Sequence, residues 1–295
     1  ELTKEGAISE ARLDESVRRI LKLKYDLGLF ENPFPDKKLL KTLTPEVYNE
    51  KALQAARESM TLLKNENGVL PLPKTARVLL AGPAANNLTS LHSSWSYVWP
   101  GNDDSQYPKS TPTIKDVFVK LLGAENVICS SVRDFEANEN YDAKKLTTDA
   151  KDVDYIILCL GEKAYAEGVG VIDDLKLDDK QQELAQAAIA TGKKVILVLA
   201  EGRPRVISKI EPGMSGILMA YRPSTMGAQA IADVLFGDYN PGGKLPFTYP
   251  KASGDIVLYD YKPTEVFRDA EPNDSGKGAI RPQYPFGYGL SYTTY

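Results

Sequence analysis

The chain has 295 residues, of which 42% are hydrophobic and 26% charged, and its formal net charge is −4. This composition is ordinary for a globular protein. No long basic block is present, which argues against nucleic acid and anionic membrane surfaces as partners, and no apolar run approaches the roughly 20 residues of a membrane span. One histidine, His92, and two cysteines, Cys129 and Cys159, offer too little material for a zinc site. We expect both cysteines to be buried as small hydrophobic residues. The sequence neither predicts nor excludes a disulfide between them.

The first predicted element is an amphipathic helix that begins after Ser9 and ends at Gly28. Its apolar residues share one face, and they are Leu13, Val17, Ile20, Leu21 and Leu27. A lone helix cannot bury its own apolar stripe, so we expect it to dock on another domain. Residues 31–36 contain Pro33 and Pro35, which predict a stiff, extended linker.

From Thr44 onward, predicted helices alternate with predicted strands. The expected helices cover residues 45–58, 114–122, 181–190 and 227–236, and the expected strands cover 60–63, 77–81, 126–129, 155–160, 194–200 and 216–220. Such alternation indicates an α/β fold with a mainly parallel sheet covered on both faces. From Asp238 onward the sequence is rich in Gly, Pro and Tyr and predicts irregular structure, with an exposed polar loop over 269–277.

The most informative segment covers residues 161–168, because it follows the apolar run 155–160 and carries Glu162 and Glu167. A short, β-rich apolar run is typical of a buried strand in a parallel sheet. Open α/β sheets place their ligands at the carboxyl ends of such strands. Either glutamate is therefore a candidate general acid/base, and the alternative is a solvated loop with ordinary surface carboxylates.

A second loop, residues 91–101, places Trp95, Tyr97 and Trp99 in a polar setting. Aromatic faces stack on the C–H faces of sugars, which favours carbohydrate binding, and the alternative is core packing under a long loop. We expect His92 to be a structural hydrogen-bonding residue and not a catalyst.

Two further segments that follow predicted strands are candidates for functional sites. The Gly82–Pro83 turn lacks both the glycine pattern and the lysine of a phosphate-binding loop, so it predicts only a tight turn. The segment 201–205, which contains Arg203 and Arg205, follows the strand predicted at 194–200. An arginine there could pair with a carboxylate or hold the neighbouring loop, and we favour a structural role.

Taken together, five segments resemble glycoside hydrolase family 3. Residues 8–30 resemble the last helix of that family's (β/α)8 barrel domain, and residues 57–65 with 70–72 resemble the start of its second domain. Residues 161–168 resemble its acid/base loop. Residues 230–246 match its most specific motif, and residues 285–292 resemble its closing signature. They occur in the family's order and cover essentially the whole chain.

The resemblance implies retaining hydrolysis of terminal β-linked sugars, most often by a β-glucosidase or a β-xylosidase. Residues 1–30 would be the terminal helix of a barrel domain, 31–43 a linker, and 44–295 the α/β-sandwich domain. In this family the barrel supplies an aspartate nucleophile and the α/β sandwich supplies an acid/base glutamate.

Four residues of this chain fall at positions to which the family gives a role. Glu167 falls at the acid/base position, and Glu162 is implied to support its loop. Trp95 and Trp99 are implied to bind substrate, with Trp99 the better match to the leaving-group subsite.

The resemblance also implies partners. These are a β-glucoside or oligosaccharide substrate and the barrel segment of the same enzyme, without a cofactor, nucleic acid or membrane. The barrel is not in these 295 residues, which stop where a fibronectin-like domain often begins, so we expect no turnover by this chain alone. Periplasmic or secreted localisation is expected.

Two observations bear on how far the resemblance holds. Residues 221–226 replace the family's usual Leu-Pro-Gly-type turn, which puts the local loop geometry in doubt. The glutamate at the acid/base position argues against the N-acetylglucosaminidase branch, which uses a histidine in a barrel loop. A different class of function stays open, in which the chain is a non-catalytic carbohydrate-binding or scaffold module that has lost its barrel.

Overall fold

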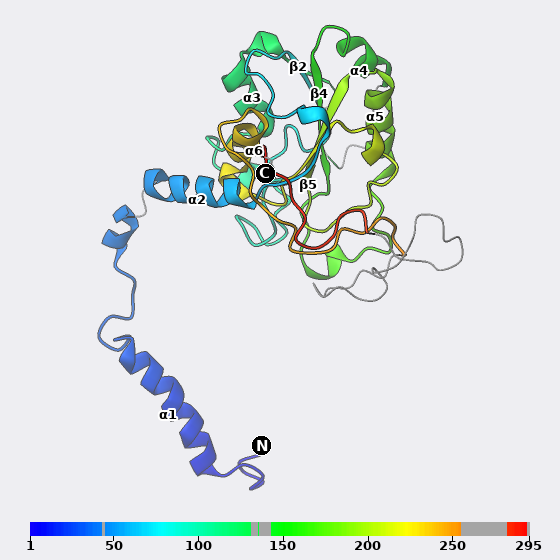
Figure 1. The fold of residues 1–295 in the computed structure, drawn as a ribbon. Coiled ribbons are helices and arrows are strands. Elements are labelled where there is room, and N and C mark those ends of the chain that lie inside the picture. Colours follow the sequence, from blue (N-terminus) through cyan, green and yellow to red (C-terminus); the bar gives the residue numbers. More distant parts are fainter. Residues whose placement is uncertain (43–44, 131–134, 136–142, 255–281, 294–295) are drawn as a thin grey trace. The chain divides into compact units, whose positions relative to one another are not determined.

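The structure is a computed structural model that describes residues 1–42, 45–130, 135, 143–254 and 282–293 (Figure 1). It divides into two compact units, Glu1–Tyr48 and Asn49–Tyr295. The loop predicted at 269–277 and the helix cap predicted at Thr44 lie outside the described residues. Among the helices of the described ranges, none combines the length and the hydrophobicity that crossing a bilayer requires.

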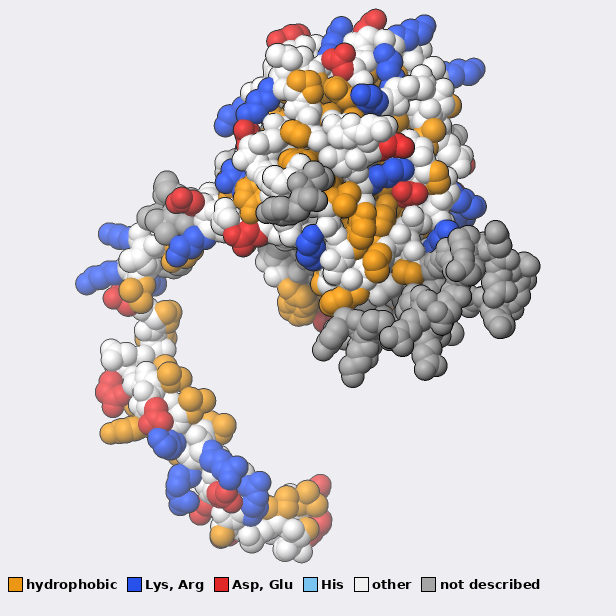
Figure 2. Space-filling view, in the orientation of Figure 1, with side chains coloured by type: hydrophobic (Ala, Val, Ile, Leu, Met, Phe, Trp, Pro, Cys, Tyr) orange, Lys and Arg blue, Asp and Glu red, His pale blue; other side chains and the backbone are white. Residues whose placement is uncertain are grey.

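The first unit contains helix α1 (Glu10–Asp26) and a short 3₁₀ helix, Lys37–Thr42. The Ser9 side chain accepts a hydrogen bond from the Arg12 N–H, and Gly28 adopts a positive φ of 65° after the helix, so both predicted ends are confirmed. None of the α1 side chains is buried. Leu13, Val17 and Ile20 are exposed, and Figure 2 shows hydrophobic side chains along this helix. That the stripe docks on a barrel stays a prediction.

The second unit is built on one six-stranded sheet, in the order β1-β6-β5-β4-β2-β3. The strands are β1 (Thr61–Asn65), β2 (Val78–Ala81), β3 (Val127–Cys129), β4 (Tyr155–Gly161), β5 (Lys194–Ala200) and β6 (Gly216–Met219). Only the edge pair of β1 with β6 is antiparallel, and the other pairs are parallel. The predicted α/β fold with a mainly parallel sheet is confirmed.

Helices cover both faces of this sheet (Figure 1). One face packs against α2 (Pro45–Ser59), α3 (Ile114–Leu122) and α6 (Gly227–Leu235), and the other against α4 (Ala143–Asp149) and α5 (Asp179–Ala190). Side chains alternate along each strand, so Ile157 and Val198 enter the first core while Ile156 and Leu197 enter the second. The run 155–160 is apolar throughout because both of its faces are buried.

The two cysteines are both free thiols, but they differ in burial. Cys159 in β4 is fully buried, whereas Cys129 in β3 is only partly buried. The prediction that both are buried is therefore wrong for Cys129, because β3 is an edge strand paired only with β2.

The described part of the C-terminal segment returns to the sheet. Leu290 bridges Leu62 of β1, and Tyr284 bridges Tyr249. The Tyr292 hydroxyl donates a 2.6 Å hydrogen bond to the carbonyl of Val234 in α6. Isolated bridges of this kind agree with the irregular structure predicted after Asp238.

Helix α3 begins with a complete capping box, which gives a first testable prediction. The Thr113 hydroxyl accepts the Asp116 N–H at 3.2 Å, and the Asp116 carboxylate accepts the Thr113 N–H at 3.0 Å. Thr113→Ala is expected to lower the free energy of unfolding by about 1 kcal/mol, measured by urea denaturation, because it leaves helix N–H groups unsatisfied. Thr113→Ser keeps the hydroxyl and is the matched control. An equal loss in both variants would contradict this role for the hydroxyl.

Candidate active site

Four segments meet at one edge of the sheet, where β2, β4, β5 and β6 end. Residues 82–113 follow β2, residues 162–178 follow β4, residues 201–210 follow β5, and residues 220–226 follow β6. These four strands are consecutive in the sheet, in the order β6-β5-β4-β2, and each pairs in parallel with the next, so their carboxyl ends lie along the same edge. This is the edge at which open α/β sheets bind ligands.

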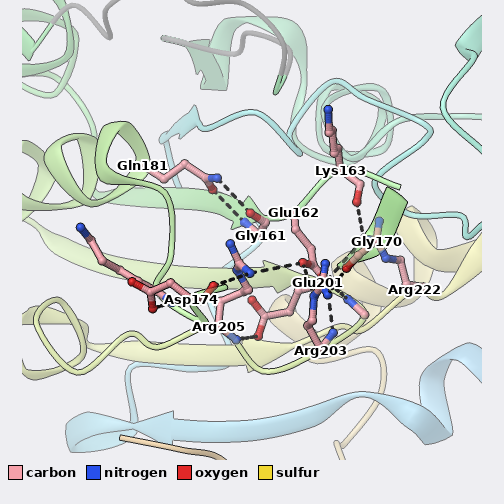
Figure 3. Close-up of polar contacts among 12 residues, drawn as sticks. Gly161, Glu162, Lys163, Gly170, Asp174, Gln181, Glu201, Arg203, Arg205 and Arg222 are labelled. Atoms are coloured by element: carbon pink, nitrogen blue, oxygen red, sulfur yellow. Dashed lines mark hydrogen bonds and ion pairs between the residues drawn. The ribbon is translucent and has the colours of Figure 1, made fainter. Parts of the chain in front are cut away.

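Glu162 is the buried anchor of this edge, with only 8% of its surface exposed. Its Oε1 accepts the backbone N–H groups of Gly202 at 3.1 Å and Arg203 at 3.2 Å, and its Oε2 accepts Arg203 Nε at 3.0 Å (Figure 3). The guanidinium groups of Arg222 and Arg205 lie 3.8 and 3.9 Å away. A buried carboxylate persists only where such partners compensate its lost hydration. Glu162 therefore joins the segment after β4 to the segment after β5.

Arg203 performs the structural role predicted for an arginine of the segment 201–205. Besides pairing with Glu162, it donates through Nη1 to the carbonyl of Gly170 at 2.5 Å, which closes the loop after β4. Its guanidinium also lies 4.1 Å from the ring centroid of Tyr165, within the range of a cation–π interaction.

Tyr165 fills the space between the loops after β4 and β5. A Cβ atom added at Gly202 would lie 2.9 Å from the Tyr165 hydroxyl, so the phenol packs closely against the backbone at Gly202. Burial raises the pKa of the Tyr165 phenol, and the negative charge of Glu162 raises it further. The phenol therefore stays neutral beside the ion pair.

Glu167 has the opposite environment to Glu162, because its side chain is exposed. It begins a short 3₁₀ helix, Glu167–Gly170, and its backbone adopts a φ of 48°. The left-handed region is unfavourable for a residue with a Cβ atom, and such strain often accompanies functional sites. The Glu167 Oε1 accepts a long hydrogen bond of 3.4 Å from Trp99 Nε1, so the segment after β2 reaches the segment after β4.

Trp95 and Trp99 are surface residues, with exposed fractions of 71% and 45%. Their ring centroids are 6.5 Å apart at an interplanar angle of 71°, an edge-to-face arrangement. The Trp95 N–H donates to the Trp99 carbonyl at 3.0 Å, which holds the loop in shape. Neither ring therefore packs in the hydrophobic core of this unit.

His92 is structural, as predicted. It is buried, and its Nδ1 lies 2.8 Å from the carbonyl of Leu88. Burial lowers the pKa of the imidazole, although the Leu88 carbonyl and the charge of Asp104 oppose that effect. The ring packs on Tyr107 with centroids 4.4 Å apart. It supports the loop that carries the two tryptophans.

A fully buried carboxyl, Glu201, lies directly after β5. Its Oε1 is 2.9 Å from the hydroxyl of Tyr249 and accepts the Arg205 N–H at 3.3 Å. Burial raises the pKa of Glu201 to about 8. The sequence did not single out this residue, because nothing in the local pattern distinguishes a buried glutamate from an exposed one.

The edge also contains a cavity of 350 Å³. It is lined by Ser93, Ser94, Tyr165, Gly202, Tyr221 and Arg222. Within the described ranges, no group of three or more His, Cys, Asp and Glu side chains could hold a metal ion. The described residues present carboxyl, hydroxyl, guanidinium and indole groups at this edge.

A family model described as the glycosyl hydrolase family 3 C-terminal domain matches residues 60–292. The chain belongs to glycosyl hydrolase family 3. The match confirms the family predicted from the five sequence segments, and it covers the whole sheet together with the candidate site.

Curated family 3 proteins from several kingdoms are similar to this chain. A lysosomal β-glucosidase of Dictyostelium discoideum is 36% identical, over all of this chain and 36% of that protein. A periplasmic β-glucosidase of Salmonella typhimurium is 32% identical, over all of this chain and 42% of that protein. A β-xylosidase of Formosa agariphila is 34% identical, over 96% of this chain and 39% of that protein.

Solved family 3 structures have the same fold. The β-glucosidase of Listeria innocua superimposes with a TM-score of 0.85 at 30% identity, over 99% of this chain and 40% of that chain. A mutant of the same Listeria enzyme was crystallised in complex with laminaribiose, and it gives a TM-score of 0.84. The chain thus spans about two fifths of the length of these four relatives, which carry the names of three β-glucosidases and one β-xylosidase.

Proposed function

We propose that this chain supplies the acid/base loop of a retaining β-glucosidase, with Glu167 as the general acid/base. The nucleophile would come from a barrel segment of the same enzyme, which is outside these residues. Glu162 would support the loop, and Trp95 and Trp99 would bind substrate, with Trp99 at the leaving-group side. Because relatives carry the names lysosomal and periplasmic β-glucosidase, we also propose a periplasmic or secreted enzyme.

The observation that carries this proposal is the contrast between the two glutamates of one loop. Glu162 is buried and bonded to Arg203, so its oxygens are already occupied. Glu167 is exposed, and among the described residues its carboxylate has one polar contact, the long hydrogen bond of 3.4 Å from the Trp99 indole. A carboxyl beside an aromatic ring, at the ligand-binding edge of the sheet, can reach a glycosidic oxygen whose sugar stacks on that ring.

The reaction would proceed in two steps. In the first, the Glu167 carboxyl donates its proton to the glycosidic oxygen while the barrel carboxylate bonds to the anomeric carbon, and the alcohol leaves. In the second, the Glu167 carboxylate takes a proton from water, the water oxygen bonds to the anomeric carbon, and the nucleophile is released. Retention requires the two carboxyl groups to be about 5–5.5 Å apart across the sugar.

A β-xylosidase is the second candidate, and the relative from Formosa agariphila supports it. The two candidates share the mechanism and differ in the terminal sugar. In the proposed enzyme, barrel residues make most contacts to that sugar, so the described residues leave the choice between glucose and xylose open.

The test is an assay of the complete polypeptide that carries this chain. We expect hydrolysis of aryl β-glucosides with a higher kcat/KM than of aryl β-xylosides, and the β-anomer as the first product seen by NMR. These 295 residues alone, at the same concentration, should give no turnover. A higher kcat/KM for the xyloside would select the second candidate. Inversion, or sugar binding without hydrolysis by the complete polypeptide, would contradict the proposal, and the latter would favour a non-catalytic carbohydrate-binding module.

A further inference from the structure

One side chain, Arg222, bonds the two loops that carry the proposed functional residues. It lies in the segment after β6, and only 9% of its side chain is exposed. Its Nη1 donates to the carbonyl of Ser90 at 3.0 Å, and its Nη2 donates to the carbonyl of Lys163 at 2.8 Å. Figure 3 shows the guanidinium between the Lys163 carbonyl and the Glu162 side chain.

The two acceptors belong to different parts of the candidate site. Ser90 precedes the tryptophans in the segment after β2, and Lys163 lies four residues before Glu167 in the segment after β4. These segments meet again at the surface, where Trp99 Nε1 is 3.4 Å from Glu167 Oε1. The Arg222 hydrogen bonds and the contact between Trp99 and Glu167 therefore join the same two segments.

Both acceptors are backbone carbonyls, so the bonds fix the course of the main chain itself. A guanidinium presents its N–H groups in a rigid planar fork, which lets one side chain serve two acceptors in a set geometry. The Arg222 guanidinium is itself held in place by two neighbouring side chains. Glu162 Oε1 is 3.8 Å from Nη2, and the Tyr165 ring centroid is 5.7 Å from the guanidinium carbon. The N–H of Ser224, two residues on, donates to the Leu91 carbonyl at 2.7 Å and ties the same turn to the Trp99 loop.

We propose that Arg222 is a positioning residue, which sets the separation between Trp99 and Glu167 by holding the main chain of both loops. This inference rests on the proposed acid/base role of Glu167. Arg222 acts through the carbonyls of Ser90 and Lys163, and it takes no part in proton transfer. The geometry of the leaving-group side of the site therefore depends on a residue outside the two loops that form it.

Displacement of the Glu167 carboxyl should lower kcat/KM most for a substrate whose leaving group must be protonated as it departs. In the complete enzyme, Arg222→Gln and Arg222→Lys are expected to lower kcat/KM for an alkyl β-glucoside by about 10²-fold, the size of effect that misplacement by an ångström can produce. For a dinitrophenyl β-glucoside the loss of kcat/KM should be at least several-fold smaller, because that leaving group departs without a proton. Lysine should not substitute, because one ammonium lacks the planar fork that serves both carbonyls. Low concentrations of guanidinium should restore part of the activity of Arg222→Ala.

Controls separate positioning from mere folding. Arg77→Lys changes an exposed arginine just before β2, at the opposite end of that strand, and should leave both substrates unaffected. An equal loss for both substrates with a lower Tm and no guanidinium rescue would overturn the proposal, as would wild-type rates with the alkyl glucoside. Glu167→Ala is assayed in parallel. If Glu167→Ala is slow and the Arg222 variants are not, only the positioning role fails, and if Glu167→Ala keeps its rate with the alkyl glucoside, the proposed function fails.

Discussion

In the complete enzyme, Glu167→Ala is expected to slow the hydrolysis of an alkyl β-glucoside by about 10²–10⁴-fold, the usual contribution of a general acid. An alkoxide is a poor leaving group, so breaking the glycosidic bond without a proton donor is slow. The measurement is kcat/KM, which reports the first irreversible step. The exposed position of Glu167 means that removing its side chain should leave the fold unchanged, which the Tm of the variant checks.

A dinitrophenyl β-glucoside should separate the two roles of Glu167. Its leaving group needs no proton, so the first step stays fast and the glycosyl-enzyme accumulates because water is no longer activated. Both kcat and KM should then fall together, and kcat/KM should change little. Azide, which attacks without needing a base, should restore turnover and yield the β-glycosyl azide.

The matched control is Asp173→Ala, because Asp173 is an exposed carboxylate in the same segment after β4. It should keep wild-type kinetics with both substrates. If Glu167→Ala keeps wild-type rates with both substrates, or if azide yields no β-glycosyl azide, the acid/base assignment is wrong.

The fold could be predicted from the sequence where burial imposes a simple pattern. The strand predicted at 194–200 and the helix predicted at 114–122 have the observed bounds of β5 and α3. In the strand a continuous run of apolar residues, and in the helix an apolar face, identifies the element. Helix α4 was not predicted, because Ala143–Asp149 is short and polar and Leu146 is the one residue of this helix assigned to the buried core.

The site could be predicted only as far as the loops that form it. Glu162 and Glu167 lie five residues apart in similar local sequence, and what distinguishes them is Arg203, which is 41 residues from Glu162 in the chain. Arg222 is 59 residues from Lys163 and 132 from Ser90. Contacts between residues so far apart in the sequence depend on the order of the strands in the sheet. The periodicity of hydrophobic residues does not reveal that order. The family resemblance supplied a role for Glu167, but it gave none for Arg222 or Glu201.

The second large expected effect is a pH dependence of the free energy of unfolding, and it comes from the buried carboxyl of Glu201. The hydroxyl of Tyr249 is 2.7 Å from the Arg205 carbonyl and 2.9 Å from Glu201 Oε1. The one proton of the Tyr249 hydroxyl is shared between two acceptors when Glu201 is ionised, whereas a protonated Glu201 can donate to the Tyr249 oxygen and leave that proton to the Arg205 carbonyl. The other oxygen, Oε2, is buried without a hydrogen-bond partner among the described residues. An ionised carboxylate in that position would be costly.

The proton on Glu201 makes stability depend on pH with a definite sign. Burial raises the pKa of Glu201 from 4.5 to about 8. The folded state therefore keeps a proton that the unfolded state releases above its ordinary pKa. The resulting stability is fully present below that value and is lost as pH rises toward 8, at up to about 1.4 kcal/mol per pH unit.

Glu201→Gln removes this titration while keeping the shape of the side chain and a donor for Tyr249. The difference in free energy of unfolding, variant minus wild type, is expected to grow by on the order of 4 kcal/mol between about pH 5 and about pH 8. Urea midpoints across this range measure the difference, and Tm values should follow the same trend. Glu183→Gln, which replaces an exposed carboxylate of α5, should give a difference that stays flat with pH. A flat difference for Glu201→Gln would mean that the buried carboxyl is already ionised at neutral pH, and that the proton of the Tyr249 hydroxyl is then shared between its two acceptors.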